Sequence, residues 1–189
     1  MTDLLQNAIS ILTNLLLWPV VILLLYGICY SLFTLGNMLV ESFQRKGKPE
    51  TITDPRQPSD FVSRFQGIQE WKHQLSLDAQ APLWLVLDRT EAALKKRIDR
   101  VRNWIKLGPA LGLAGTLIPL GSALKAVGVN NMKLLSDELT VAFGATVLGL
   151  TAGVIAMVVV TNYERWYALD LAEVRHALET LEEIEIVRN

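Results

Sequence analysis

The sequence has a single cysteine, Cys29, and only two histidines, His73 and His176. One cysteine cannot form an intrachain disulfide, and Cys29 lies inside an apolar run where it serves as a small apolar side chain. Neither histidine has a second His or Cys at the spacing of metal ligands. No Ser–His–Asp or Cys–His arrangement suggests a catalytic centre either. We therefore predict that the chain is not an enzyme and binds no cofactor or metal.

The chain also lacks an excess of charge of either sign. Its 18 Lys and Arg residues nearly balance 19 Asp and Glu residues, for a formal net charge of -1 at pH 7. Nucleic-acid-binding domains usually carry a basic surplus, so no nucleic-acid partner is expected. Hydrophobic residues make up 51% of the chain, which composition alone would allow in a soluble domain. Their distribution excludes that interpretation, because they are concentrated in three blocks with the charges between them.

Charge is absent from three long apolar runs. No charged residue occurs between Asp3 and Glu41, within Leu107–Leu124 or within Leu139–Tyr163. Each run is long enough for a helix to cross a hydrocarbon layer of about 30 Å. The first run lacks the basic start of a signal peptide and is too long for one. We predict an all-α integral membrane protein with three transmembrane helices, the last two extended into the cytoplasm.

The charges between the runs define four segments. We expect an N-terminal transmembrane helix at 1–40, a cytoplasmic helical segment with a proline-rich connector at 41–106, a transmembrane hairpin at 107–163 and a cytoplasmic helical tail at 164–189. Thirteen of the 18 Lys and Arg residues fall in 41–106. Basic residues favour the cytoplasmic side of membrane proteins. The N-terminus and the hairpin should therefore lie outside, and the C-terminus in the cytoplasm.

Local patterns predict a helix in the polar segment. Asp60 is a candidate N-cap, because apolar residues follow it at helical spacing. These are Phe61, Phe65, Ile68, Trp71 and Leu75. The connector before this helix, Gly47–Asp60, contains three prolines and is expected to be extended. A further helix should then run without interruption from near Pro82 to near Leu124.

Capping residues indicate the turn between the last two runs. The chain should reverse at Asn130–Asn131, and Ser136 is the expected N-cap of the last helix. This helix should continue past Tyr163, since no helix-breaking residue follows. Its acidic tail can pack against the basic 41–106 segment or remain solvated.

Small residues mark the last two runs as packing surfaces. The first contains Gly112 and Gly115. In the second, a helix would place five small residues on one face, with Thr146 beside them: Ala142, Ala145, Gly149, Gly153 and Ala156. Because lipid provides no hydrophobic drive for helix association, membrane helices use such faces to approach each other closely. We interpret these residues as a face for packing against protein and as candidates for lining a pore.

Two motifs in this hairpin resemble a known family. GPALGLAGT at 108–116 and VAFGATVLGL at 141–150 are similar to the Pro–x–x–Gly–Leu–x–Gly–Thr and Ala–x–x–Ala–Thr–x–x–Gly runs of the MotA/TolQ/ExbB proton channel family. One earlier span and a large intervening loop resemble the TolQ and ExbB layout. Two features differ from that layout. Val141 stands where those proteins usually carry Glu, and residues 153–156 lack their usual proline.

The resemblance implies an ion channel and stator subunit of an inner-membrane motor driven by the proton-motive force. It implies a homo-oligomeric ring, typically a pentamer, around a single-span partner of the TolR, ExbD or MotB type. Thr116 and Thr146 match the family's pore-lining threonines, although threonines in membrane helices commonly bond back to their own helix. Because the spans contain no Asp, Glu, Lys or Arg, the resemblance implies that the titrating Asp comes from the partner. The alternative is a non-conducting membrane scaffold of a transport or envelope complex, which Val141 favours.

Overall fold

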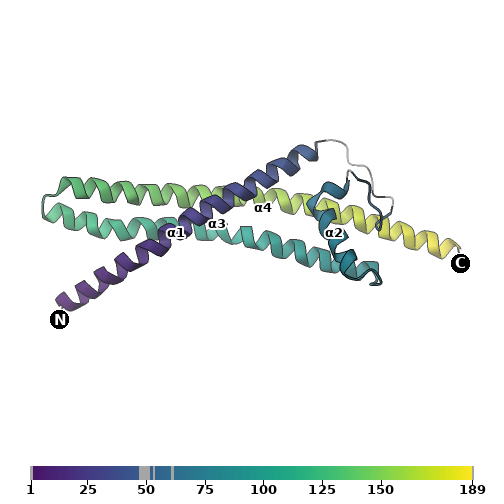
Figure 1. Ribbon diagram of the computed structural model, residues 1–189, viewed down its shortest axis with the longest axis horizontal. Helices are drawn as coiled ribbons and strands as arrows, with labels where there is room; N and C mark the ends of the chain where they lie inside the picture. Colours follow the sequence, from purple (N-terminus) through teal and green to yellow (C-terminus); the bar gives the residue numbers. More distant parts are fainter. Residues whose placement is uncertain (1, 47–51, 53, 61, 189) are drawn as a thin grey trace. The chain divides into compact units, whose positions relative to one another are not determined.

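The computed structural model describes residues 2–46, 52, 54–60 and 62–188, and all regular structure within them is helical. The elements, in chain order, are α1 (Thr2–Gln44), a short 3-10 helix (Val62–Arg64), α2 (Gln66–Leu77), α3 (Leu83–Gly128) and α4 (Met132–Arg188) (Figure 1). Three of them, α1, α3 and α4, are long and apolar enough to cross a membrane. The structure confirms the all-α fold with three helices of membrane-spanning length.

The turn between α3 and α4 is tighter than the sequence suggested. α3 is the uninterrupted helix predicted from near Pro82, and it continues to Gly128. The chain reverses at the predicted place, where Asn130 has a φ of 50°, in the left-handed region that asparagine tolerates. The N-cap was predicted wrongly. Asn131 caps α4, because its Oδ1 accepts the amide of Leu134 at 3.1 Å, and Ser136 lies inside the helix.

α2 also begins later than predicted. Its N-cap position is Phe65, whose side chain makes no capping hydrogen bond, so Asp60 does not cap this helix. Asp60 instead precedes the 3-10 helix, where its carbonyl oxygen accepts the hydroxyl of Ser63 at 2.9 Å. Phe61 and residues 47–51 and 53 of the expected connector lie outside the described residues.

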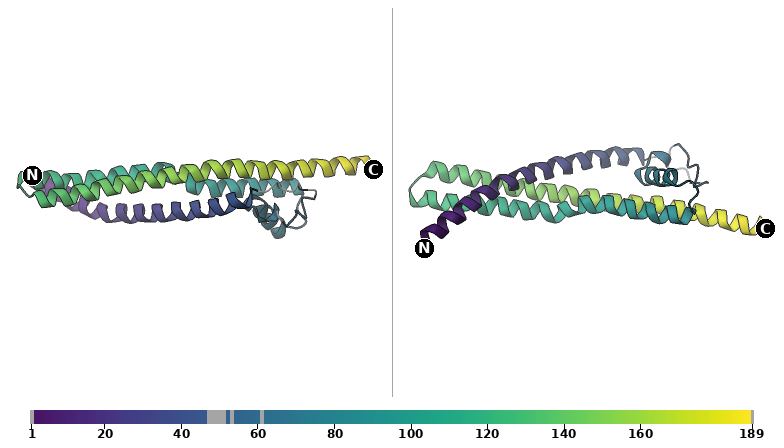
Figure 2. Two further views of the ribbon diagram at one scale, coloured as in Figure 1. Left: turned by 90° about the horizontal axis from the view of Figure 1, so that it is seen from above. Right: turned by 60° about the horizontal axis from the view of Figure 1, so that its bottom comes forward.

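The chain divides into two compact units, of which the first comprises Met1–Leu35 and Val101–Val158. Within it α3 and α4 run antiparallel and side by side, and α1 crosses them obliquely, as Figure 2 shows. Val20 and Leu24 of α1 form a small apolar cluster with Ala145 of α4. The Ser31 hydroxyl donates to the carbonyl oxygen of Ala152 at 3.3 Å. These contacts hold the first helix against the hairpin.

α1 and α3 are in close contact at Gly27. The ring of Trp104 covers this glycine so tightly that a Cβ there would overlap the ring. Tyr26 packs against the same ring, with 5.9 Å between centroids, and stacks on Tyr30 at 6.0 Å. Because only glycine leaves room for the indole, Gly27 determines where α1 crosses α3.

The second unit comprises Gly36–Arg100 and Val159–Asn189 and contains an apolar core. Ile68 and Trp71 of α2 pack in this core with Val86 of α3 and Val174 of α4. The indole of Trp71 donates to the carbonyl oxygen of Pro55 at 2.7 Å, which fixes part of the connector. Of the two alternatives for the tail of α4, packing against the 41–106 segment is therefore the one observed.

Candidate ion-pathway helices

The backbones of α3 and α4 touch along a seam of glycines. A Cβ added to Gly149 would lie 2.8 Å from the Cα of Gly112, and one added to Gly108 would lie 2.6 Å from the carbonyl oxygen of Gly149. Further along, a Cβ on Gly153 would lie 2.9 Å from the Cδ of Pro109. A Cβ at Gly108, Gly149 or Gly153 would overlap the facing helix, and one at Gly112 would lie only 3.3 Å from the carbonyl oxygen of Ala145, so the four glycines let the two main chains approach closely.

Gly115 and Ala145 continue this seam toward the hairpin. Gly115 of α3 faces the Cβ of Ala145, and Leu24 of α1 is the next nearest group. Ala142 and Ala156 of α4 are buried. The small residues that the sequence singled out thus pack helices of one chain against each other. Their part in a pore lining stays a prediction.

The two threonines lie beside this seam. Gly115 and Ala145 are in contact, and Thr116 and Thr146 are the next residues on the antiparallel helices, so the two are offset by about 3 Å along the helix axis. Both are partly exposed. The structure therefore brings the two predicted ion-pathway residues to the same level of the helix pair.

Their hydroxyl groups are held differently. Thr116 Oγ1 donates to the carbonyl oxygen of Leu113 at 2.7 Å, a well-formed bond within α3. Thr146 Oγ1 lies 3.5 Å from the carbonyl oxygen of Ala142, at the outer limit of a hydrogen bond. Rotation away from this weak contact costs little, so Thr146 is the hydroxyl more easily turned toward water or a carboxylate.

The end of the pair near the hairpin carries the nearest acids. Val141, where TolQ- and ExbB-type proteins usually have Glu, lines a hollow together with Asp137, Glu138 and Ser122. Both carboxylates stand within one helical turn before Val141 on α4. Among the described residues, no group of three His, Cys, Asp or Glu side chains is placed to hold a metal ion.

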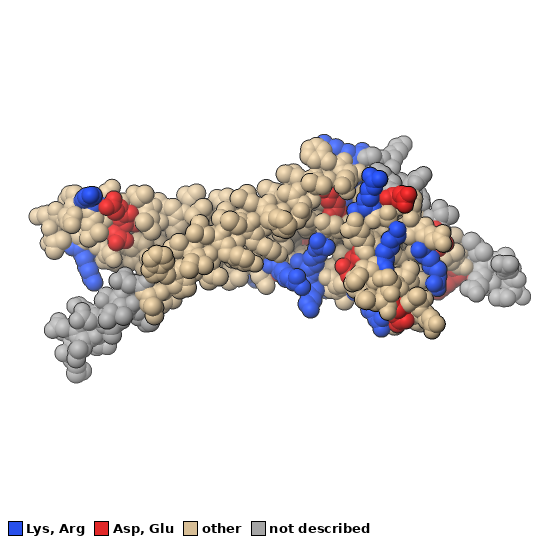
Figure 3. Space-filling view, viewed as in Figure 1, with Lys and Arg blue, Asp and Glu red and all other residues tan. Residues whose placement is uncertain are grey.

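The outer surface of these helices is apolar. On the face shown in Figure 3, charged side chains gather near the α3–α4 hairpin, and the helical stretch next to it is uncharged. Large exposed apolar residues of this unit include Trp18, Ile22, Leu113, Leu117, Phe143, Val147 and Val154. Such a surface would be unstable in water and matches the interior of a bilayer. The fold and the glycine seam define a multi-pass helical membrane protein built around a closely packed, uncharged helix pair.

Comparison with protein families shows to which family of membrane proteins the chain belongs. The chain belongs to the MotA/TolQ/ExbB proton channel family, whose model matches residues 64–175, more than half of the 189 residues. The matched range begins in the 3-10 helix and ends in α4, so α1 lies outside it. A comparison with curated protein sequences finds no match. The match confirms the resemblance found in the two motifs, and it assigns a proton-channel or stator-like role of a general kind.

Proposed function

We propose that this chain is the channel-forming stator subunit of a motor driven by the proton-motive force. Copies of the chain, five by resemblance, form a ring around the membrane spans of a partner of the TolR, ExbD or MotB type. The family match supports the general role. The ring, the partner and the force-generating step are the proposal.

One observation carries this proposal. α3 and α4 place two hydroxyls at one level of their packed pair, and neither Leu107–Leu124 nor Leu139–Tyr163 contains Asp, Glu, Lys, Arg or His. A threonine hydroxyl donates and accepts hydrogen bonds but does not titrate near neutral pH. Proton relays through membranes commonly use Asp, Glu or His side chains. The carboxylate therefore comes from another chain, and the threonines stabilise water or that carboxylate.

The energy available is sufficient for such a step. One elementary charge crossing a membrane potential gains about 2.3 kcal/mol per 100 mV. In the proposed cycle, a proton neutralises the partner carboxylate, which lets it pass the apolar ring, and the proton leaves on the opposite side. Each transfer changes the partner's preferred position against the ring, so the ion gradient turns one component against the other.

The charge distribution supports an orientation. We propose an inner-membrane location with the N-terminus and the α3–α4 hairpin outside, and with residues 41–106 and 164–189 in the cytoplasm. The support is the concentration of 13 of the 18 Lys and Arg residues in 41–106, against two in the hairpin.

Proton flux into liposomes tests the proposal. The chain is purified and reconstituted with and without its partner, and a pH-sensitive dye inside the vesicles reports proton uptake. The chain alone should give no specific flux, and addition of the partner should produce it. Thr146→Val removes the hydroxyl at constant shape and should reduce the partner-dependent flux while the complex still assembles.

Thr140→Val is the matched control for this variant. Thr140 is an exposed threonine of the same helix, and its hydroxyl donates to the carbonyl oxygen of Ser136 at 2.8 Å. Flux should survive this substitution. Proton uptake by the chain alone would contradict the external carboxylate, and undiminished flux in Thr146→Val would leave that threonine a purely structural role.

The second candidate function is a membrane scaffold that keeps the family fold without conducting. Val141 favours it, because an apolar side chain replaces the carboxylate usual in TolQ- and ExbB-type proteins. A scaffold would bind its partner with the same stoichiometry but would show no flux in the liposome assay. Flux measured on a complex of confirmed composition therefore separates the two functions.

A further inference from the structure

A cluster of three charged side chains lies in the second unit, and its two acids are buried. Arg45, directly after α1, donates from Nη1 and Nη2 to the two carboxylate oxygens of Asp170 on α4, at 2.8 and 2.7 Å. The same guanidinium donates from Nε and Nη2 to Glu41 Oε1, at 3.0 and 2.7 Å. One cation thus joins two acids that are far apart in the sequence.

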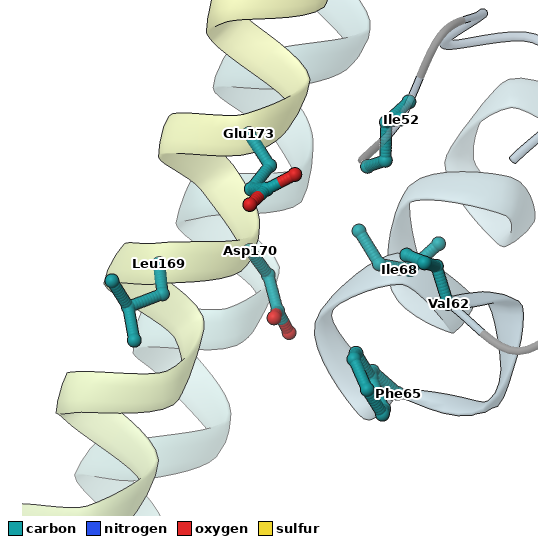
Figure 4. Close-up of a pocket in the computed structure, with 7 residues that line it drawn as sticks. All are labelled: Ile52, Val62, Phe65, Ile68, Leu169, Asp170 and Glu173. Atoms are coloured by element: carbon teal, nitrogen blue, oxygen red, sulfur yellow. The ribbon is translucent and has the colours of Figure 1, made fainter. Parts of the chain in front are cut away.

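Close packing shields the two acids from most of the surrounding water, whereas the side chain of Arg45 is 13% exposed. Glu41 is only 3% exposed and Asp170 only 6%. The Arg45 guanidinium lies over the ring of Phe65, 4.2 Å from its centroid, and faces the ring of Trp166 at 5.2 Å. On the side of α2, a Cβ at Gly67 would overlap the Asp170 carboxylate, and Asp170 also lines a small pocket with Phe65 and Ile68. Figure 4 shows Asp170 leaving α4 toward the segment that carries Phe65.

The charges in this cluster do not balance. Two carboxylates face one guanidinium, so the fully ionised cluster carries a net charge of -1. Burial lowers the pKa of Arg45, but the hydrogen bonds and charges of Asp170 and Glu41 outweigh it and raise the pKa above its ordinary value. The arginine therefore stays charged, and only an acid can take up a proton to neutralise the cluster.

The hydrogen bonds indicate which acid that is. Both oxygens of Asp170 accept from Arg45, so a proton on Asp170 would displace one of these bonds. Glu41 Oε1 accepts from Arg45 and from the amide of Gln66, at 3.4 Å. Glu41 Oε2 is buried and has no hydrogen-bond partner in the described part of the chain. A charged oxygen in that position is unfavourable, and a neutral acid costs less to bury.

We propose that Glu41 Oε2 is a proton-binding site, occupied when the cluster is closed and separate from the threonines of α3 and α4. With the proton bound, Arg45 and Asp170 form a neutral pair that holds the end of α1 to α4. When the proton leaves, the cluster carries a buried negative charge and its closed form is disfavoured. The protonation of one residue thereby controls the attachment of α1 to α4 in this unit.

Among the described residues, Arg45 is the cation that acts on Glu41, and the other polar groups packed nearby do not replace the proton. On α4, the Tyr167 hydroxyl donates to the Gln66 side chain of α2 at 2.9 Å, so it is already engaged. Arg97 of α3 interacts electrostatically with Tyr167, and its own side chain is exposed. Of these groups, Arg45 alone is a cation in direct contact with Glu41.

Infrared difference spectroscopy on the purified full-length chain in liposomes tests the site. A protonated carboxylic acid has a carbonyl band that the carboxylate lacks, and its intensity is followed while the pH is raised from about 6, where ordinary Asp and Glu side chains are already ionised. The wild-type chain should lose a band equivalent to about one acid per chain. Glu41→Gln should lack this band over the same pH range. Absence of the band in the wild type, or its persistence in Glu41→Gln, would overturn the proposal.

Two further variants test the charge balance. Asp170→Asn leaves one acid for one guanidinium, so Glu41 should ionise and the same band should disappear although Glu41 is intact. Glu179→Gln removes an exposed acid of the same helix and should leave the band unchanged. A band retained in Asp170→Asn, with the fold verified by circular dichroism, would show that the two acids do not share one proton. This experiment needs neither the partner nor ion flux, so its outcome is independent of the proposed channel function.

Discussion

The glycine seam between α3 and α4 leads to a prediction with a matched control on one helix. Gly149 and Gly144 both lie in α4, in the same apolar run. A Cβ added to Gly149 would lie 2.5 Å from the carbonyl oxygen of Gly108, and one added to Gly144 would meet no atom of the described chain within 4 Å. The same substitution, Gly→Ala, should therefore cause a steric clash at Gly149 and none at Gly144.

The loss of stability expected for Gly149→Ala follows from these distances. Ordinary van der Waals contact begins near 3.4 Å, so the two backbones must part by about 0.9 Å to admit the methyl group of Gly149→Ala. A gap of 0.5–1 Å forfeits roughly a quarter to a half of the dispersion energy of the contacts involved. Overpacking of this kind typically costs about 1–3 kcal/mol. The obstructing atoms are main chain and cannot rotate away, which favours the upper part of this range.

Thermal unfolding in a mild detergent, followed by circular dichroism, measures the difference. Gly149→Ala should unfold at a clearly lower temperature than the wild type, whereas Gly144→Ala should unfold at the same temperature or slightly higher, because alanine is the better helix former. Equal midpoints for the two variants would refute the close backbone contact between α3 and α4.

Two further predictions concern α1 and the orientation of the chain. Gly27→Ala should lower the unfolding temperature, because its methyl group would overlap the ring of Trp104, and Gly36→Ala, which meets no described atom within 4 Å, should not; equal effects would show that the indole is free to move. In a chain without its native cysteine, a cysteine at Asn130 should react with an impermeant reagent added outside intact cells, and one at Arg89 should not; the opposite pattern would reverse the proposed topology.

The membrane-spanning helices were predictable because their signal is local. A long run without charge can be stable only in a bilayer or a large core, and this chain is too short to bury three such runs. The continuity of α3 and the turn at Asn130 also followed from local patterns. The cap of α4 did not, because Asn131 and Ser136 are equally suitable N-caps. Which of the two residues caps α4 depends on how soon the helix can begin after the turn.

The contacts between distant segments had no comparable signal. The period of small residues on α4 indicated a packing face, but glycine fits any closely approaching backbone, so it could not identify α3 as the neighbour. Arg45 and Asp170 are 125 residues apart and look like ordinary charges beside an apolar run. Gly27 and Trp104 are single residues within helices of otherwise ordinary composition. Pairs of this kind become visible only when the helices are placed together.

In α3 and α4, threonines supply the hydroxyl groups of the proposed pathway, and glycines set the spacing between the two helices. The threonines stand next to contacts between main-chain atoms, so their positions are set by the glycines and not by side-chain packing. Thr146→Val should therefore change the hydrogen bonding at this level and leave the helix spacing intact. Gly149→Ala should change the spacing and keep both hydroxyls. If the hydroxyls take part in ion transfer, Thr146→Val should lower the flux and leave the unfolding temperature unchanged. Gly149→Ala should instead lower the unfolding temperature. Equal loss of flux and stability in both would mean that Thr146 acts only through packing.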